Sequence, residues 1–175
     1  MPEHSAANTH VGSFKILAEV NLTDGDAQGV IFAQGSRFGG HSMFAKGGKL
    51  HYTYNFLGIG DEQMFVTDLP EPGAHIFGME FTKEATDEND QPTGTTKLYV
   101  DDKVVAEGPM RVMAIQFSLC GEGLCIGYDG GDAVSREYSP KFEFTGGEIV
   151  QVVFDVADEP YADVETRLAA LMARD

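Results

Sequence analysis

The second half of the chain, from Thr95 to Asp158, is a succession of short strand patterns joined by tight turns. Its three pieces read TTKLYVDDKVVAEGP, AIQFSLCGEGLCIGYDGGD and KFEFTGGEIVQVVFDVAD. Within each piece apolar and polar residues alternate, which is the period of a strand with one buried face. The pattern predicts one sheet packed on another, and it contains no arrangement of residues typical of bond cleavage.

The first half continues this period after an irregular start. Residues 1–12 are small and polar without a period, so we expect a flexible lead-in there. Further on, Gly47 and Gly48 supply the positive φ that a tight hairpin needs. Directly after the lead-in comes SFKILAEVNL, residues 13–22. Its apolar residues share one face of a strand, namely Phe14, Ile16, Ala18, Val20 and Leu22.

The end of the chain changes period after Pro160, a residue tolerated in the first turn of a helix. Apolar residues then recur at the spacing of one helical stripe. We therefore expect a short amphipathic helix over residues 160–173, with a stripe formed by Val164, Leu168, Leu171 and Met172.

These elements predict an all-β fold, an antiparallel two-sheet jelly-roll sandwich of roughly ten strands with a short C-terminal helix. Strands do not alternate with helices along the chain, which disfavours a parallel α/β sheet. A length of 175 residues suits one domain, which we place over residues 13–175.

The formal net charge of −16 restricts the partners. Binding of nucleic acid or an anionic membrane surface needs clustered Lys and Arg, so neither partner is expected. No apolar run approaches the ~20 residues of a membrane span. The N-terminal MPEHSAANTHVGSF also lacks the basic patch and apolar run of a secretory signal. We therefore expect a cytoplasmic protein.

Two cysteines, Cys120 and Cys125, flank the sequence GEGL. Two cysteines in a domain of this size do not make a disulfide framework, so we expect buried free thiols. The alternative is a bridge across the strand pair that GEGL would connect.

Three segments, LYVDDKVVAEG, GLCIGYDGGD and FTGGEIVQVVFDV, resemble the closing half of a laminin-G or concanavalin A-like lectin sandwich. More specifically, GVIFAQGSRFGGHSMFAKGGKLHYTYNFLG, EFTK, KLYVDDKVVAEGPMR and GEGLCIGYDGGDAVS resemble the C-terminal, non-catalytic region of large bacterial arylsulfatases. The similarity runs from about Ser13 to Asp175, and GSRFGGHS and YNFLG are its most specific parts.

The resemblance implies an accessory module without sulfatase activity. Sulfatases convert the Cys or Ser of a C/S-x-P-x-R motif to the nucleophile, and neither Cys120, Cys125 nor any Ser here begins that motif. We therefore expect a non-catalytic structural or interaction domain, whose partner is a sulfatase catalytic domain or a second copy of the chain. A hydrolase with a site built from scattered residues is an alternative from another class.

A carbohydrate-binding, lectin-like module is the main alternative. In HYTYNF, Tyr52 and Tyr54 share one face of a strand with Phe56, and tyrosine rings can stack on sugars. Asn55 could bond sugar hydroxyls, although it points to the opposite face. The candidate ligand-binding residues are Tyr52, Tyr54 and Asn55, together with Arg37 and His41.

Each candidate also has an interpretation without a ligand. The aromatic residues would then belong to the core, and Arg37 would form a local ion pair. His41 lacks the spacing of a metal motif, so a core or surface histidine is its default interpretation.

Calcium is the one cofactor that the sequence suggests. Asp129 and Asp132 lie in the glycine-rich GYDGGD, and calcium binds carboxylate oxygens. Because Asp and Gly are also ordinary turn residues, we expect no cofactor and retain calcium at Asp129 and Asp132 as the alternative.

Overall fold

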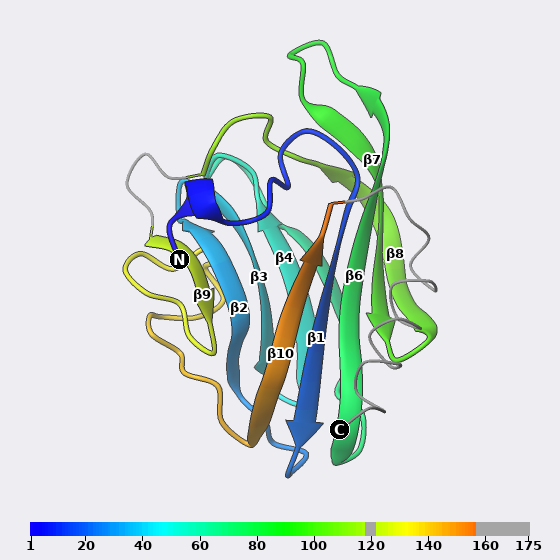
Figure 1. Cartoon of the computed structure of the whole chain (residues 1–175), viewed down its shortest axis with the longest axis vertical. Helices are drawn as coiled ribbons and strands as arrows, with labels where there is room; N and C mark the ends of the chain where they lie inside the picture. Colours follow the sequence, from blue (N-terminus) through cyan, green and yellow to red (C-terminus); the bar gives the residue numbers. More distant parts are fainter. Residues whose placement is uncertain (118–121, 157–175) are drawn as a thin grey trace.

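The computed structural model of the chain describes residues 1–117 and 122–156. These residues form two five-stranded antiparallel sheets packed face to face, and one short 3₁₀ helix, η1 (Glu3–Ser5) (Figure 1). The predicted all-β two-sheet sandwich is confirmed. The predicted helix over residues 160–173 and Cys120 lie outside the described residues, whereas Cys125 is a buried free thiol.

The first sheet has the order β10-β1-β6-β7-β8. Its strands, in that order, are Gly147–Asp155, Phe14–Leu22, Gly73–Thr86, Pro92–Val100 and Lys103–Arg111. The second sheet has the order β5-β4-β3-β2-β9. Its strands, in that order, are Gln63–Asp68, Lys49–Asn55, Gly39–Lys46, Gly29–Ser36 and Glu122–Ile126. Among the described residues, no helix has the length and apolar character needed to cross a bilayer.

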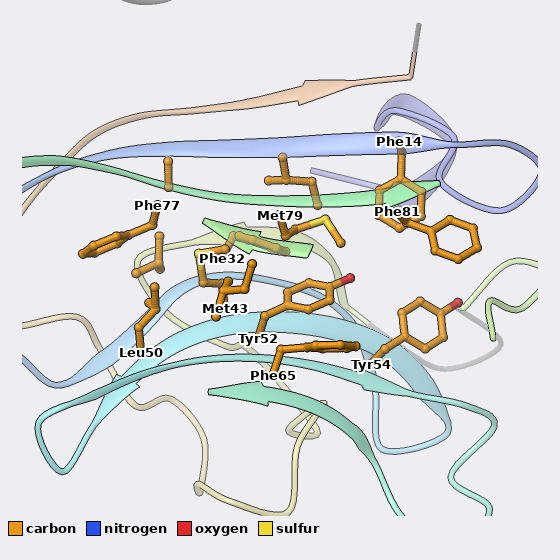
Figure 2. Packing of buried hydrophobic residues seen from close by; sticks show 14 of the residues in the cluster. Phe14, Phe32, Met43, Leu50, Tyr52, Tyr54, Phe65, Phe77, Met79 and Phe81 are labelled. Carbon is orange, nitrogen blue, oxygen red and sulfur yellow. The ribbon is translucent and has the colours of Figure 1, made fainter. Parts of the chain in front are cut away.

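The core lies between the two sheets and follows from the alternation along each strand (Figure 2). In β1, Ile16 is fully buried and stands opposite Met79 of β6. From the second sheet, Met43 and Tyr52 are opposite each other and point into the same core. The predicted inward face of β1 is thus confirmed by the burial of Phe14, Ile16, Ala18, Val20 and Leu22.

Glycines are required where the backbone turns or approaches itself. Gly47 and Gly48 have φ values of 60° and 72° in the β3–β4 turn, as the hairpin prediction required. At the β2–β3 hairpin, a Cβ on Gly35 would lie 2.6 Å from the Cα of Gly40, so only glycine fits there. The loop after β6 is short, because β6 extends to Thr86 and β7 begins at Pro92.

A row of alternating charges crosses the outer face of the first sheet. Lys15 stands opposite Asp155 of β10 on one side and Glu80 of β6 on the other. Glu80 in turn stands opposite Lys97, and Lys97 opposite Glu107. Opposite charges in directly facing cross-strand positions stabilise a sheet, each pair by roughly 0.2–1 kcal/mol. We call these five residues the charge ladder.

The outer face of the second sheet is covered by the chain itself. Val30 and Phe44 on that face pack against Val134 and Tyr138 of the segment between β9 and β10. Residues 129–142 therefore form a covering segment that removes much of this sheet face from solvent.

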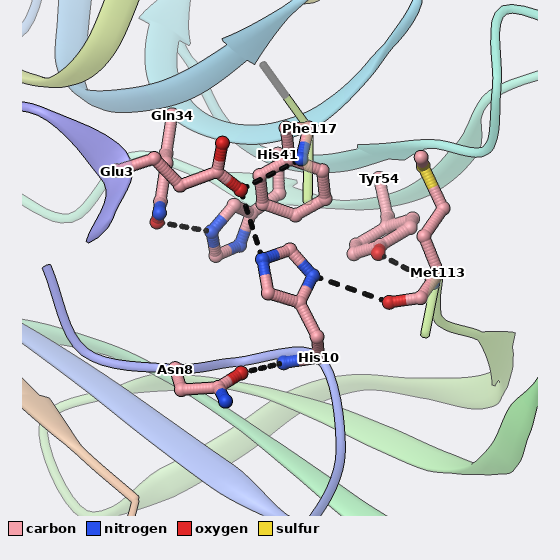
Figure 3. Close-up of polar contacts among 8 residues, drawn as sticks. All are labelled: Glu3, Asn8, His10, Gln34, His41, Tyr54, Met113 and Phe117. Atoms are coloured by element: carbon pink, nitrogen blue, oxygen red, sulfur yellow. Dashed lines mark hydrogen bonds and ion pairs between the residues drawn. The ribbon is translucent and has the colours of Figure 1, made fainter. Parts of the chain in front are cut away.

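The first twelve residues do not form the loose lead-in that their composition suggested. Glu3 and His10 are buried, and the Glu3 carboxylate accepts a hydrogen bond of 2.6 Å from the Phe117 backbone N–H. His10 Nε2 lies 2.9 Å from the same carboxylate oxygen. The prediction is corrected: buried polar contacts, which composition does not reveal, hold this segment across one end of the sandwich (Figures 1 and 3).

Candidate functional site

The predicted tyrosine stripe lies in the core rather than on the surface. Tyr52 and Tyr54 are both 0% exposed, and their rings point between the sheets (Figure 2). Burial raises the pKa of both hydroxyl groups above the ordinary value. The exposed aromatic face that sugar stacking would require is therefore absent at these two residues. Alternation correctly placed them on one face, but that face is the inner one.

His41 also belongs to the core. It is fully buried, with Nδ1 3.1 Å from the Tyr52 hydroxyl and Nε2 3.2 Å from Oε1 of Gln34. Burial, with a smaller contribution from the charge of His10, lowers the pKa of His41 to about 3. The ring is therefore neutral near pH 7. Aromatic rings enclose it, among them Phe14 and Phe117, which Figure 3 shows beside it.

Asn55, in contrast, joins three loops at one end of the second sheet. Its side-chain amide donates to the carbonyl of Arg37 at 3.1 Å and to that of Val134 at 2.8 Å. Its Oδ1 accepts a hydrogen bond of 2.9 Å from the Gly58 N–H. We call the surface formed by residues 37–38, 56–62 and 129–137 the three-loop surface.

Arg37 and Asp132 meet on the three-loop surface. The Arg37 Nε lies 3.3 Å from a carboxylate oxygen of Asp132, and both side chains are exposed. The guanidinium group also lies 4.7 Å from the centroid of the Phe38 ring. Arg37 therefore forms the local ion pair that its interpretation without a ligand predicted.

Asp129 and Asp132 contact different partners. Asp129 is buried, and its Oδ2 accepts hydrogen bonds from the Tyr138 hydroxyl at 2.6 Å and the Val134 N–H at 2.9 Å. This carboxylate therefore anchors the covering segment, while Asp132 faces Arg37. Across residues 1–117 and 122–156, no group of three His, Cys, Asp or Glu residues is placed to hold a metal ion.

The three-loop surface borders a cavity of about 360 Å³ lined by Asp61, Glu62, Met64, Arg136 and Glu137. Glu62 is held rigidly, because its carboxylate accepts hydrogen bonds from the Thr53 hydroxyl (3.1 Å), the Ser135 hydroxyl (2.6 Å) and the Arg136 N–H (2.7 Å). The Arg136 side chain donates to the Gly58 carbonyl at 3.3 Å and so connects the cavity to the neighbouring loop.

Apolar side chains stand exposed on the loops of the three-loop surface. Phe38, Leu57 and Ile59 are 51%, 38% and 70% exposed. Leu57 has a φ of 56°, a conformation that costs an L-residue roughly 1–2 kcal/mol. A strained backbone that displays apolar side chains to solvent is the kind of feature found at binding surfaces.

A second cavity, of about 250 Å³, lies under the N-terminal segment, where Glu3, Asn8, His10 and Gln116 contribute polar groups. The ring nitrogens of His10 already face the Met113 carbonyl and the Glu3 carboxylate. This cavity is therefore the weaker candidate for a ligand.

Four of the seven residues that the sequence suggested as candidates lie at the three-loop surface, and three lie elsewhere. Arg37, Asn55, Asp129 and Asp132 all lie at the three-loop surface, whereas His41, Tyr52 and Tyr54 lie in the core. Phe38 could have been noticed as an aromatic residue in a glycine-flanked turn. Glu62 and Arg136 carry no local signal, because they meet only through contacts across more than seventy residues.

Neither a protein-family model nor a curated protein sequence matches this chain. In structure, the chain resembles domains LG4-5 of the mouse laminin α1 chain, with a TM-score of 0.55, 13% identity and coverage of 88% of this chain and 38% of that one. The receptor-binding domain of botulinum neurotoxin type G has a TM-score of 0.60 at 10% identity, with coverage of 93% and 39%. The binding domain of botulinum neurotoxin DC, solved in complex with SialylT, has a TM-score of 0.59 at 12% identity, with coverage of 94% and 37%.

These neighbours establish the fold as a laminin G and lectin-like β-sandwich. At 10–13% identity the likeness concerns the fold alone, and the chain spans less than two fifths of each of the three chains. None of these three structures connects the chain to arylsulfatases.

Proposed function

We propose that this chain is a non-catalytic, lectin-like module that binds carbohydrate at the three-loop surface. The observation that carries the proposal is the cavity of about 360 Å³, which is lined by one guanidinium and three carboxylates on a surface whose loops also expose apolar side chains. Binding sites commonly combine a concave shape, a few oriented polar groups and apolar contact area.

The chemistry of this lining suits a sugar. Carboxylates of Asp61, Glu62 and Glu137 can accept hydrogen bonds from hydroxyl groups, and the Arg136 guanidinium can donate to ring or hydroxyl oxygens. The exposed Phe38 ring offers contact for the C–H face of a sugar.

The site is also preorganised for a ligand. Glu62 is fixed by three donors, and Asn55 joins the three loops, so little conformational entropy remains to be lost when a ligand binds. Likeness to the neurotoxin DC binding domain, solved with SialylT, adds support only at the level of the fold.

A second candidate function is docking to a catalytic domain of the arylsulfatase type. The segments GSRFGGHS and YNFLG, which carry the sequence resemblance to arylsulfatases, contribute residues 37–38 and 56–58 to the three-loop surface. If the resemblance reflects a shared role, this surface would face a catalytic domain, and Leu57 and Ile59 would be covered by it.

A glycan array tests the first candidate, with binding to the intact chain compared with binding to Phe38→Ala and Ile59→Ser. Val104→Ser is a matched control, because Val104 is 46% exposed on β8 of the other sheet. We expect a restricted set of glycans to bind, and both three-loop variants to weaken that binding while the control does not.

Two outcomes would contradict binding of carbohydrate at the three-loop surface. Glycan binding that survives both three-loop variants would move the site elsewhere on the sandwich. Absence of any glycan binding, together with co-elution of the chain and an arylsulfatase catalytic domain, would favour the second candidate.

A further inference from the structure

The cavity of the three-loop surface carries an excess of negative charge. Its lining contains three carboxylates, from Asp61, Glu62 and Glu137, and one cationic group, from Arg136, a formal charge of −2. A ligand that enters this cavity therefore meets a negative field, within a chain whose formal net charge is −16.

Neighbouring cations offset this charge only in part, because Lys46 lies beside the Glu137 carboxylate and leaves a formal charge of −1. Arg37 is paired with Asp132, and Lys46 lies 3.9 Å from the Glu137 carboxylate while its ammonium donates to the Glu137 carbonyl. The Arg136 guanidinium already donates one hydrogen bond to the Gly58 carbonyl. An anionic ligand would have to compete with these internal partners for a cation.

The carboxylates are also too dispersed to serve a bound metal ion. Throughout the described part of the chain, no three acidic, His or Cys side chains are arranged around a common point. Glu62 accepts three hydrogen bonds from the protein, which leaves about one of the roughly four lone-pair positions of its carboxylate for a ligand. Separated acceptors suit a ligand that carries several hydroxyl groups at a distance from one another.

We infer that the three-loop surface selects neutral glycans and discriminates against sialylated and sulfated ones. This inference rests on the proposed function and specifies its ligand class. Hydroxyl groups of a neutral sugar satisfy the dispersed carboxylates, whereas an added sialic acid or sulfate group brings a like charge next to them.

The test uses matched glycan pairs on the intact chain. Lactose, N-acetyllactosamine, and oligosaccharides of glucose and mannose are presented beside their sialylated or sulfated forms, and the pair that gives the strongest signal is then titrated by calorimetry. We expect the neutral member to bind about tenfold more tightly at low salt, the factor that corresponds to ~1.4 kcal/mol of repulsion. The difference should shrink as salt rises, because added ions screen exposed charges.

Two variants connect the selectivity to the cavity. Asp61→Asn and Glu137→Gln each remove one negative charge and should raise affinity for the anionic member of the pair relative to the neutral one. Asp102→Asn, in the exposed β7–β8 turn, changes the net charge equally and serves as the control.

The possible outcomes separate the two proposals. An anionic glycan that binds as tightly as its neutral partner, or more tightly, overturns the inference and leaves the proposed function standing. An equal shift in Asp102→Asn shows that net charge alone governs selectivity, which also overturns the inference. Absence of binding to every glycan in both classes overturns the proposed function and the inference together.

Discussion

The hydroxyl oxygen of Tyr54 accepts a hydrogen bond of 2.8 Å from the backbone N–H of Met113 within the buried end of the core. Tyr54 lies on β4, whereas Met113 follows β8, so this contact joins the second sheet to the chain leaving the first. A residue predicted to contact sugar is therefore a structural connection between the sheets (Figure 3).

Tyr54→Phe should destabilise the fold by ~1–3 kcal/mol, because the Met113 N–H would be left buried without a partner. Urea denaturation followed by circular dichroism measures the change. Tyr99→Phe is the matched control, since the Tyr99 hydroxyl donates to the partly exposed Glu80 and water can replace that contact. Equal losses in the two variants would contradict the structural role of the Tyr54 hydroxyl.

His41 should make the fold less stable at mildly acidic pH. Its pKa falls to about 3 in the folded chain because of burial, whereas the unfolded value lies near 6.5. Between these pH values the unfolded chain binds a proton at His41 that the folded chain does not bind. His41 therefore leaves the free energy of unfolding unchanged above pH 6.5, and it lowers that free energy as pH falls below 6.5. The expected slope is on the order of 1 kcal/mol per pH unit.

Comparison with His41→Gln separates the pH dependence caused by His41 from that caused by titration of the many carboxylates. The variant removes the titrating group, so its stability should fall less steeply between pH 6.5 and 4 than that of the parent chain. Parallel stability curves for the two proteins would show that His41 does not titrate as its burial predicts.

Asp129 and Tyr138 should stabilise the covering segment as a unit. Their buried contact of 2.6 Å involves a charged acceptor, so Asp129→Asn and Tyr138→Phe should show a coupling of ~1–3 kcal/mol in a double-mutant cycle. Calcium should leave the melting temperature of the parent chain unchanged, because Asp129 is engaged within the protein. A rise in melting temperature with calcium, lost in Asp129→Asn, would restore the alternative of a calcium site.

Glu3→Ala should cost ~1–3 kcal/mol, because it removes the hydrogen-bond partner of His10 and leaves the buried Phe117 N–H without an acceptor. Thermal unfolding measures the loss. Glu88→Ala, in the exposed loop between β6 and β7, is the control and should change stability little. A small effect of Glu3→Ala would mean that the first twelve residues contribute little to the fold.

Much of the fold could be predicted because it depends on local alternation. The faces of β1, the Gly47–Gly48 turn and the β7–β8 hairpin all follow from short sequence patterns. Alternation does not say which face of a strand is buried, however. In β4, Tyr52 points inward because it meets Met43 and Phe65 from neighbouring strands, and such pairings are not visible in one segment.

The site was harder to predict because it is built from loops. The covering segment has no period, and Glu62 reaches Ser135 and Arg136 only after the whole sandwich has formed. The sequence suggests Asn55 as a residue that bonds sugar hydroxyls, yet its side chain connects loops from three parts of the chain.

The charge ladder has a consequence for how the strands find their alignment. Sliding β10 by two residues along β1 would preserve the pattern of inward and outward side chains, so the core alone discriminates weakly against it. That slip would bring Asp155 opposite Leu17 in place of Lys15, and it would separate the charges at that end of the row. The charge pairs on the outer face of the first sheet thus favour the observed register of β10 over a slipped register that would bury the same apolar face.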